Sequence, residues 1–169
     1  MSRLRLGGSG GQGLSEFALV IPIFLFLVLA ILDLGRVVWA NNSVTNAARE
    51  AARWAIVHGG SSTTACPAGP PGVYTKIPAA SSACPFPSPS KQSVRNTALQ
   101  HAVAGGTNIQ VTVCYGNGCA GDVDVTGATN SRGTPVTVRV TSDIALVTGA
   151  FLGLSDYSAA GTITMYVSH

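Results

Sequence analysis

The stretch "FALVIPIFLFLVLAIL" at residues 17–32 decides the architecture, because it holds no charged or strongly polar side chain. Its 16 residues fall short of the roughly 20 that a helix needs to cross a bilayer. A span of about 14–35 supplies the missing length and places Glu16 and Asp33 near its two ends, where ionised groups cost far less than at mid-bilayer. Pro22 removes one hydrogen bond inside this span, which predicts a bend.

The helical pattern continues after the span, over "DLGRVVWANNSVTNAAREAARWAIVHGG" at residues 33–60. Glu50 lies three residues before Arg53, a spacing at which opposite charges meet on a helix. Gly59 and Gly60 then end the pattern. The sequence therefore predicts one helix over residues 14–58, whose rise of about 1.5 Å per residue gives a rod of about 65 Å.

The rest of the chain predicts a loop and a small head. Residues 59–90 are rich in Gly, Ser, Ala and Pro, and a short second helix is expected within residues 88–106. Apolar and polar residues then alternate, which is typical of strands with one apolar face in an antiparallel sheet. Three such strands are expected around residues 109–115, 136–141 and 162–167, with a weaker fourth at residues 123–125. The expected fold class is α+β, with a long membrane-spanning helix followed by a short helix and a sheet of three or four antiparallel strands.

Two apolar features leave their packing partner open. The first is the apolar segment "IALVTGAFLGL" at residues 144–154, which is either core or a surface for a partner. The second is a narrow stripe of small side chains at helical spacing, which packs against helices of other subunits, against the chain's own sheet, or against both. The stripe consists of Val44, Ala47, Ala48, Ala51 and Ala55.

The four cysteines all follow the apolar segment. An even number of cysteines in an exported region favours two disulfides formed in an oxidising compartment. We favour the pairs Cys66–Cys84 and Cys114–Cys119, because each pair brackets a local loop, and the second encloses "YGNG" as a four-residue hairpin loop. A zinc site is the alternative, but only Cys114 and Cys119 have a short spacing and no matching second pair exists.

Residues with catalytic or ligand-binding patterns are scarce. The leader segment "GSGGQG" matches G-x-G-x-x-G, but no βαβ unit surrounds it, so we do not expect a dinucleotide site. Asp122 and Asp124 resemble a calcium loop only weakly, because the remaining acids of such a loop are missing. The histidines His58, His101 and His169 have no recurring acid or cysteine neighbours. We expect no catalytic residue, no metal site, no cofactor and no small-molecule substrate, and hence no enzyme.

The charge pattern predicts the topology. The formal net charge of +3 is spread thinly, without the basic cluster that nucleic-acid binding needs. Arg3 and Arg5 precede the apolar span, so the positive-inside rule places the N-terminus in the cytoplasm and the head outside. The apolar run is longer than that of a secretory signal peptide, and no A-x-A cleavage site follows it.

Counting from a glycine in the leader gives a further pattern. If a protease cuts after Gly11, Gln12 becomes residue one, and Glu16 and Phe17 become residues five and six of the mature chain. A glycine, four residues, a glutamate, an aromatic residue and a long apolar helix form a prepilin processing signature. The segment resembles the N-terminal region of TadE-like proteins, the pseudopilins or minor pilins of the tight-adherence (Tad, Flp-type) pilus. The similar features are Gly11-Gln12, "EFAL" at residues 16–19, Pro22, "DLGR" at residues 33–36 and "NAAREAAR" at residues 46–53, where the family usually has glycine at Ala51.

The resemblance implies a function in pilus assembly. A membrane prepilin peptidase would remove the leader, residues 1–11, on the cytoplasmic side, leaving a helix over residues 12–58. The mature helix would contact other Tad pilus subunits through Glu16 and the segment around Pro22, with Glu16 pairing with the N-terminal amine of a neighbouring subunit. Such a protein would be a single-pass protein of the cytoplasmic membrane, with an extracytoplasmic head over residues 91–169.

Two other functions stay open at this point. One is a signal-anchored extracellular binding module or enzyme whose helix is only a tether. The other is a major pilin, although Flp-type major pilins are typically much shorter than this chain. Ligand binding by the head would favour the tethered module, and abundance in purified filaments would favour the major pilin.

Overall fold

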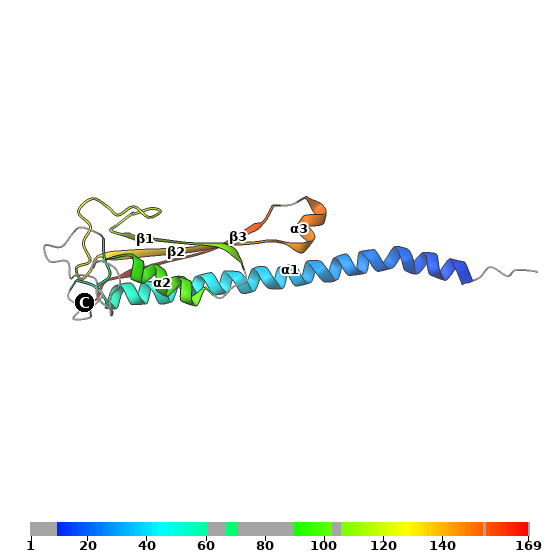
Figure 1. Cartoon of the computed structure of the whole chain (residues 1–169), viewed down its shortest axis with the longest axis horizontal. Helices are drawn as coiled ribbons and strands as arrows, with labels where there is room; N and C mark the ends of the chain where they lie inside the picture. The colour runs from blue at the N-terminus through cyan, green and yellow to red at the C-terminus, as the bar shows by residue number, and fades with distance from the viewer. Residues whose placement is uncertain (1–9, 61–66, 71–89, 103–105, 154, 169) are drawn as a thin grey trace, which may run out of the picture.

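The computed structural model describes residues 10–60, 67–70, 90–102, 106–153 and 155–168, with the side chains of residues 10–12 left out. Three helices and three strands occur in these ranges (Figure 1). In chain order they are α1 (Gly10–Val57), α2 (Gln92–His101), β1 (Thr107–Tyr115), β2 (Pro135–Ile144), α3 (Val147–Leu152) and β3 (Tyr157–Tyr166). The predicted fold class is confirmed: a long helix carries a small α+β head.

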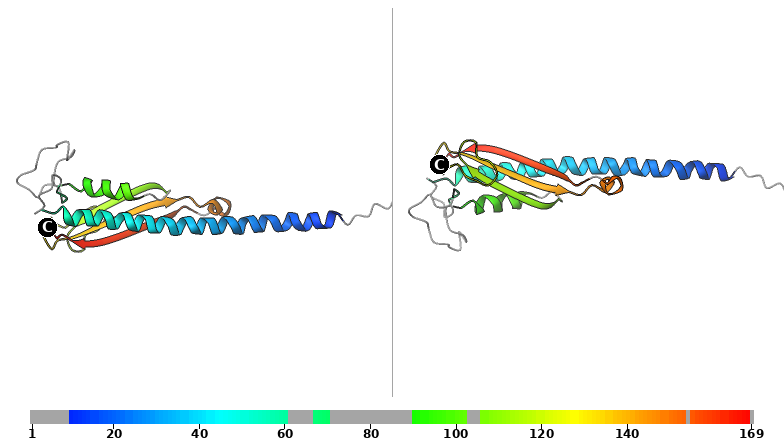
Figure 2. Two further views of the ribbon diagram at one scale, coloured as in Figure 1. Left: turned by 90° about the horizontal axis from the view of Figure 1, so that it is seen from below. Right: turned by 90° about the horizontal axis from the view of Figure 1, so that it is seen from above.

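Helix α1 has 48 residues, so its rise of about 1.5 Å per residue gives a rod of about 72 Å. It begins at Gly10, inside the expected leader (residues 1–11), and it continues through Pro22 without a break. The head lies along its C-terminal half, while its N-terminal half projects alone (Figures 1 and 2). The rod therefore has two parts with different surroundings.

The sheet is an antiparallel meander in the order β1-β2-β3. One face carries the alternating apolar residues that the sequence predicted, and α1 and α2 cover that face (Figure 2). The register places Val113, Val138 and Ile163 side by side across the three strands. The opposite face carries mainly threonines and Arg139, and Thr137 and Thr164 share a hydrogen bond of 2.8 Å across it. The sheet therefore buries one face and exposes the other.

The fourth strand expected at residues 123–125 does not form. Val123 makes only an isolated bridge to Ala120, and the side chains of Val123 and Val125 are exposed. The segment is part of a loop that turns at Gly116, whose N–H donates to the carbonyl of Pro135 over 2.9 Å. The expected hairpin around "YGNG" is therefore wrong as a strand pairing, because the next strand begins only at Pro135.

The stripe of small side chains on α1 packs inside the chain. Val44, Ala47, Ala48, Ala51 and Ala55 are all fully buried against the head. A hydrogen at the Gly161 Cα faces this stripe, since a Cβ there would lie 2.7 Å from the N and Cα of Thr45. Of the two partners left open by the sequence, the chain's own sheet occupies the stripe, so it offers no surface to other helices.

Candidate functional site

The N-terminal part of α1 is apolar and exposed over residues 13–27, and we refer to this part as the bare apolar rod. Within the described residues, the helix over Gly13–Val57 is the one that is long and apolar enough to cross a membrane, by length and composition. Residues 13–27 are all exposed. A soluble protein rarely exposes a contiguous apolar surface of this size, so the segment is a contact surface for lipid or for other proteins. One apolar N-terminal helix of this kind is consistent with a protein that crosses the membrane once.

Four residues expected to act in processing lie at the start of this rod. Gly11 and Gln12 belong to the first turn of α1, so the peptide bond between them lies in a helix. Glu16 and Phe17 lie within two turns of that bond, and both side chains are exposed. Pro22, the other residue expected to act in assembly, lies in the same exposed segment.

The clearest polar site in the described structure joins this rod to the head at Asp33. The residue is only 4% exposed, and its two carboxylate oxygens lie at the first turn of α3. The Val147 N–H donates to Oδ1 over 3.1 Å, and the Thr148 N–H donates to Oδ2 over 2.7 Å. The Thr148 hydroxyl donates to the same Oδ2 over 2.7 Å. We refer to Asp33 and these donors as the Asp33 clamp.

The clamp stabilises a buried acid with three hydrogen bonds. A carboxylate that accepts several N–H and O–H hydrogen bonds is held far more firmly than one neutral bond would hold it. The guanidinium of Arg36 adds a charge partner, with Nη1 at 3.7 Å from Asp33 Oδ1. The sequence placed Asp33 at a membrane interface but carried no sign of Thr148, which lies 115 residues further along the chain. The sequence alone gave no indication of this contact between α1 and α3.

On the C-terminal side of the clamp, β3 runs alongside the second half of α1. The Asn41 side-chain amide donates to the Tyr157 hydroxyl over 3.2 Å at the start of β3. At the other end, the Ser168 N–H donates to the carbonyl of Ile56 over 3.1 Å. These contacts fix the height and the rotation of the head on the rod, so the head and the second half of α1 form one packed unit.

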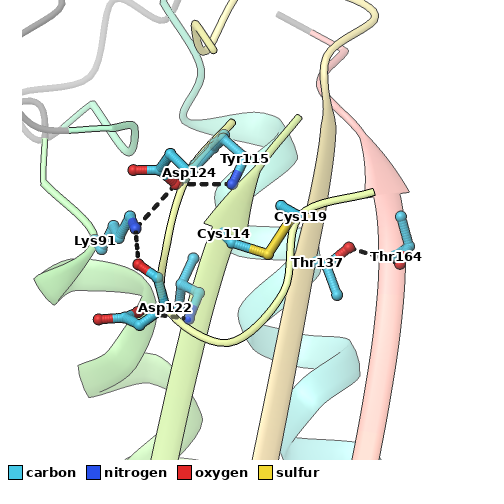
Figure 3. Close-up of a disulfide and its surroundings, with 9 residues drawn as sticks. Lys91, Cys114, Tyr115, Cys119, Asp122, Asp124, Thr137 and Thr164 are labelled. Carbon is cyan, nitrogen blue, oxygen red and sulfur yellow. Dashed lines mark hydrogen bonds and ion pairs between the residues drawn. A yellow bond between two sulfur atoms is a disulfide. The ribbon is translucent and has the colours of Figure 1, made fainter. Parts of the chain in front are cut away.

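The two acids of the weak calcium-loop pattern instead hold the loop after β1 (Figure 3). Asp122 accepts a hydrogen bond from the Val113 N–H over 3.0 Å, and Asp124 accepts one from the Tyr115 N–H over 2.9 Å. The buried Lys91 ammonium lies 2.9 Å from Asp124 Oδ1 and donates to the Asp122 carbonyl over 2.8 Å. Through these hydrogen bonds to the chain's own donors, the two acids fasten the loop to β1.

The electrostatics of this loop follow from the same contacts. Partial burial by itself raises the pKa of Asp122. The hydrogen bond from the Val113 N–H, together with the charges of Arg95 and Lys91, outweighs burial and holds that pKa below its ordinary value. Asp122 is therefore an ionised structural acid.

The remaining candidate residues divide into those that the structure describes and those that it does not. Cys114 and Cys119 form a disulfide that joins β1 to the loop (Figure 3), whereas Cys66, Cys84 and His169 lie outside the described residues. His58 stacks on Trp54 with ring centroids 3.7 Å apart, and its Nδ1 lies 2.9 Å from the Trp54 carbonyl oxygen. Among the described residues, no group of three or more His, Cys, Asp or Glu side chains is placed to hold a metal ion.

A long apolar helix that runs on into an α+β head defines the class: in the described part of the chain, one helix is a candidate membrane span, and the head is built on the second half of that helix. Residues 11–53 match the family model described as TadE-like protein, so this part of the chain is similar to that family, and the resemblance seen in the sequence is confirmed. The match includes both the bare apolar rod and the first residues that carry the head. No curated protein and no solved structure matches the chain.

Proposed function

We propose that the chain is a minor pilin or pseudopilin of a Tad (Flp-type) pilus and contributes to assembly through the bare N-terminal part of α1. The observation that carries this proposal is the exposed apolar rod with Glu16 near its start, inside a segment that matches the TadE-like family model. The continuous exposed apolar surface of α1 lies in this first half, whereas the small-residue stripe of the second half is buried by the head.

In this proposal residues 1–11 are the leader and a prepilin peptidase cuts between Gly11 and Gln12. The bond lies in the first turn of a helix, so the protease must unwind that turn to bind it as extended chain. Glycine costs about 1 kcal/mol relative to alanine in a helix, and Gly10, Gly11 and Gly13 all lie in this turn. The glycines therefore support cleavage by making local unwinding easy.

Glu16 then acts as a device for subunit register. A carboxylate at the edge of hydrocarbon is costly unless it is paired. After cleavage, the new amine of Gln12 on a neighbouring subunit supplies a positive charge at the same depth. Two unit charges 4 Å apart attract by about 4 kcal/mol at an effective dielectric constant of about 20. In a correctly staggered neighbour this attraction offsets the cost of removing the carboxylate from water, and in a shifted one it does not.

The rest of the proposal concerns topology and partners. The leader arginines Arg3 and Arg5 place the N-terminus in the cytoplasm, with the head outside the membrane or in a pilus. The partners are then the membrane, the peptidase and other Tad pilus subunits, which meet the chain through its helix.

The test uses the full chain expressed with its native pilus system. Intact mass and N-terminal sequencing of the mature protein should give Gln12 as the first residue; any other start contradicts the cleavage site. Glu16→Gln removes the charge and should abolish co-purification with pili. Glu50→Gln is the matched control, because Glu50 lies on the same helix but pairs with Arg53 of the same chain, over 3.5 Å at the surface. If Glu16→Gln behaves like Glu50→Gln and the head binds a ligand, the chain is a tethered module instead.

A further inference from the structure

The connection between β2 and β3 presents an apolar surface that the fold does not bury. Residues 144–154 carry no charged side chain, and they include the short helix α3. The residues of α3 that face the protein are Thr148 and Gly149, whereas Phe151 is 75% exposed and Leu152 58% exposed. Val147 is exposed as well. A helix on the surface of a soluble protein shows the opposite arrangement, with its large apolar side chains turned toward the core.

The Asp33 clamp fixes where this surface lies. Asp33 is the first charged residue after the apolar run, and the first turn of α3 is bound directly to it. A hydrocarbon core of about 30 Å matches about 20 helical residues, so a span that begins near Gly13 ends at about Asp33. In Figure 1, α3 is the part of the head that reaches furthest toward the N-terminal half of α1. The exposed apolar side chains of α3 are therefore level with the end of the span.

The surface of α1 around the clamp continues the same pattern. Leu34 and Val38 are exposed on the helix just above Asp33, and Trp39 is 55% exposed. Tryptophan concentrates at membrane interfaces, and the half-exposed guanidinium of Arg36 suits the level of the lipid headgroups. Apolar surface thus continues from the rod, past the clamp, to α3.

We propose that α3 inserts into the outer interfacial layer of the lipid bilayer, as a second membrane contact beside the span of α1. This inference rests on the proposed membrane insertion of α1. Phe151, Leu152 and Val147 enter the acyl boundary, and the clamp supplies donors to Asp33 in a layer where water is scarce. Because α3 is bonded to the rod and follows directly from the sheet, its insertion sets the tilt and the height of the head above the membrane.

The test places single tryptophans at chosen positions of the full chain. A background of Trp39→Phe and Trp54→Phe is reconstituted into phosphatidylcholine vesicles whose acyl chains carry bromine, which quenches tryptophan on contact. Phe151→Trp probes α3, Phe24→Trp probes the apolar rod, and Val123→Trp probes a loop at the far end of the head. All three positions are exposed, so the substitutions leave the core intact. Leu152→Trp repeats the α3 measurement from a neighbouring exposed position.

The expected result is that the probe at position 151 loses a fraction of its emission comparable to that lost at position 24. Its emission should also shift to the blue, while the probe at position 123 should not be quenched. If the probe at position 24 is quenched but those at positions 151 and 152 are not, the inference is wrong and the single span stands.

Two further outcomes would also overturn the inference. A blue shift at position 151 without quenching would mean that a second copy of the chain, and not lipid, covers α3. If the probe at position 24 is not quenched either, the membrane insertion of α1 itself is refuted, and the failure then belongs to the proposed function.

Discussion

The Asp33 clamp gives the sharpest prediction, because one side chain holds a whole connection of the head. Asp33→Ala removes three hydrogen bonds of 2.7–3.1 Å, all donated to a charged acceptor. Each such bond contributes about 1.5–3 kcal/mol on its own, but bonds to one group are not additive. A released α3 also recovers part of this energy from water. We therefore expect the free energy that holds α3 on α1 to fall by about 2–4 kcal/mol.

Amide hydrogen exchange measures this energy at the donors themselves. The Val147 and Thr148 N–H groups donate to Asp33, so their protection reports the opening of α3 directly. Since about 1.4 kcal/mol is a factor of ten, both amides should exchange roughly 30- to 700-fold faster in Asp33→Ala. The protection of Val138, in the middle of β2, should not change, because its ladder does not depend on the clamp.

Two further variants control the experiment. Asp33→Asn keeps the shape of the side chain and one acceptor oxygen. In this variant the Val147 and Thr148 amides should exchange at rates between those of the wild type and of the alanine variant. Asp143→Asn removes an acid from the same end of β2, where the side chain accepts an exposed hydrogen bond of 2.9 Å from Asn108. It should leave α3 protected. Unchanged protection of Val147 and Thr148 in Asp33→Ala would refute the clamp, and loss at Val138 as well would mean that the acid supports the whole head.

Three other changes test the packing of the head, each through the free energy of unfolding of the full chain in mild detergent. Gly161→Ala puts a Cβ 2.7 Å from the backbone of α1 and should destabilise the chain by about 1–3 kcal/mol; an unchanged value would show that β3 can move away. Because the pKa of Asp122 is lowered in the folded chain, its contribution to stability is present at neutral pH and is lost as the pH falls below about 4; Asp122→Asn should show a smaller loss over that range. Replacing both Cys114 and Cys119 by alanine opens a loop with a sequence separation of 5 and should cost about 2 kcal/mol in chain entropy, whereas a cost near zero would mean that the loop is held by its acids alone.

The elements that the sequence predicted are those with long periodic patterns. The long helix and the three strands each have a single repeat over many residues, and repeats of this kind depend only on which face is buried. The ion pair between Glu50 and Arg53 could also be predicted from the sequence, because a spacing of three residues on a helix brings two side chains together. These features could be predicted because the local geometry of a helix or a strand is enough to form them.

The features that the sequence missed depend on contacts between distant residues. Nothing in the local pattern links Asp33 to Thr148, so the acid could only be placed by its depth in the span. Acids and valines alternate over residues 122–125 with the period of a strand, but the segment meets β1 mainly through its two carboxylates. Its one backbone bond to β1 runs from the Val125 N–H to the Tyr115 carbonyl. The sequence of residues 144–154 did not show whether this apolar segment is buried or exposed, because composition alone does not distinguish a core segment from one that faces outward.

The carboxylates beside β1 also bear on how copies of the chain can meet. β1 is an edge strand, and the free N–H groups of an edge are sites where another chain can add a strand and begin an aggregate. At Val113 and Tyr115 these groups already donate to Asp122 and Asp124, which Lys91 helps to hold in place. A second copy would have to displace two anchored acids before its own backbone could pair there. Crowded heads can therefore stand side by side at this edge without fusing their sheets.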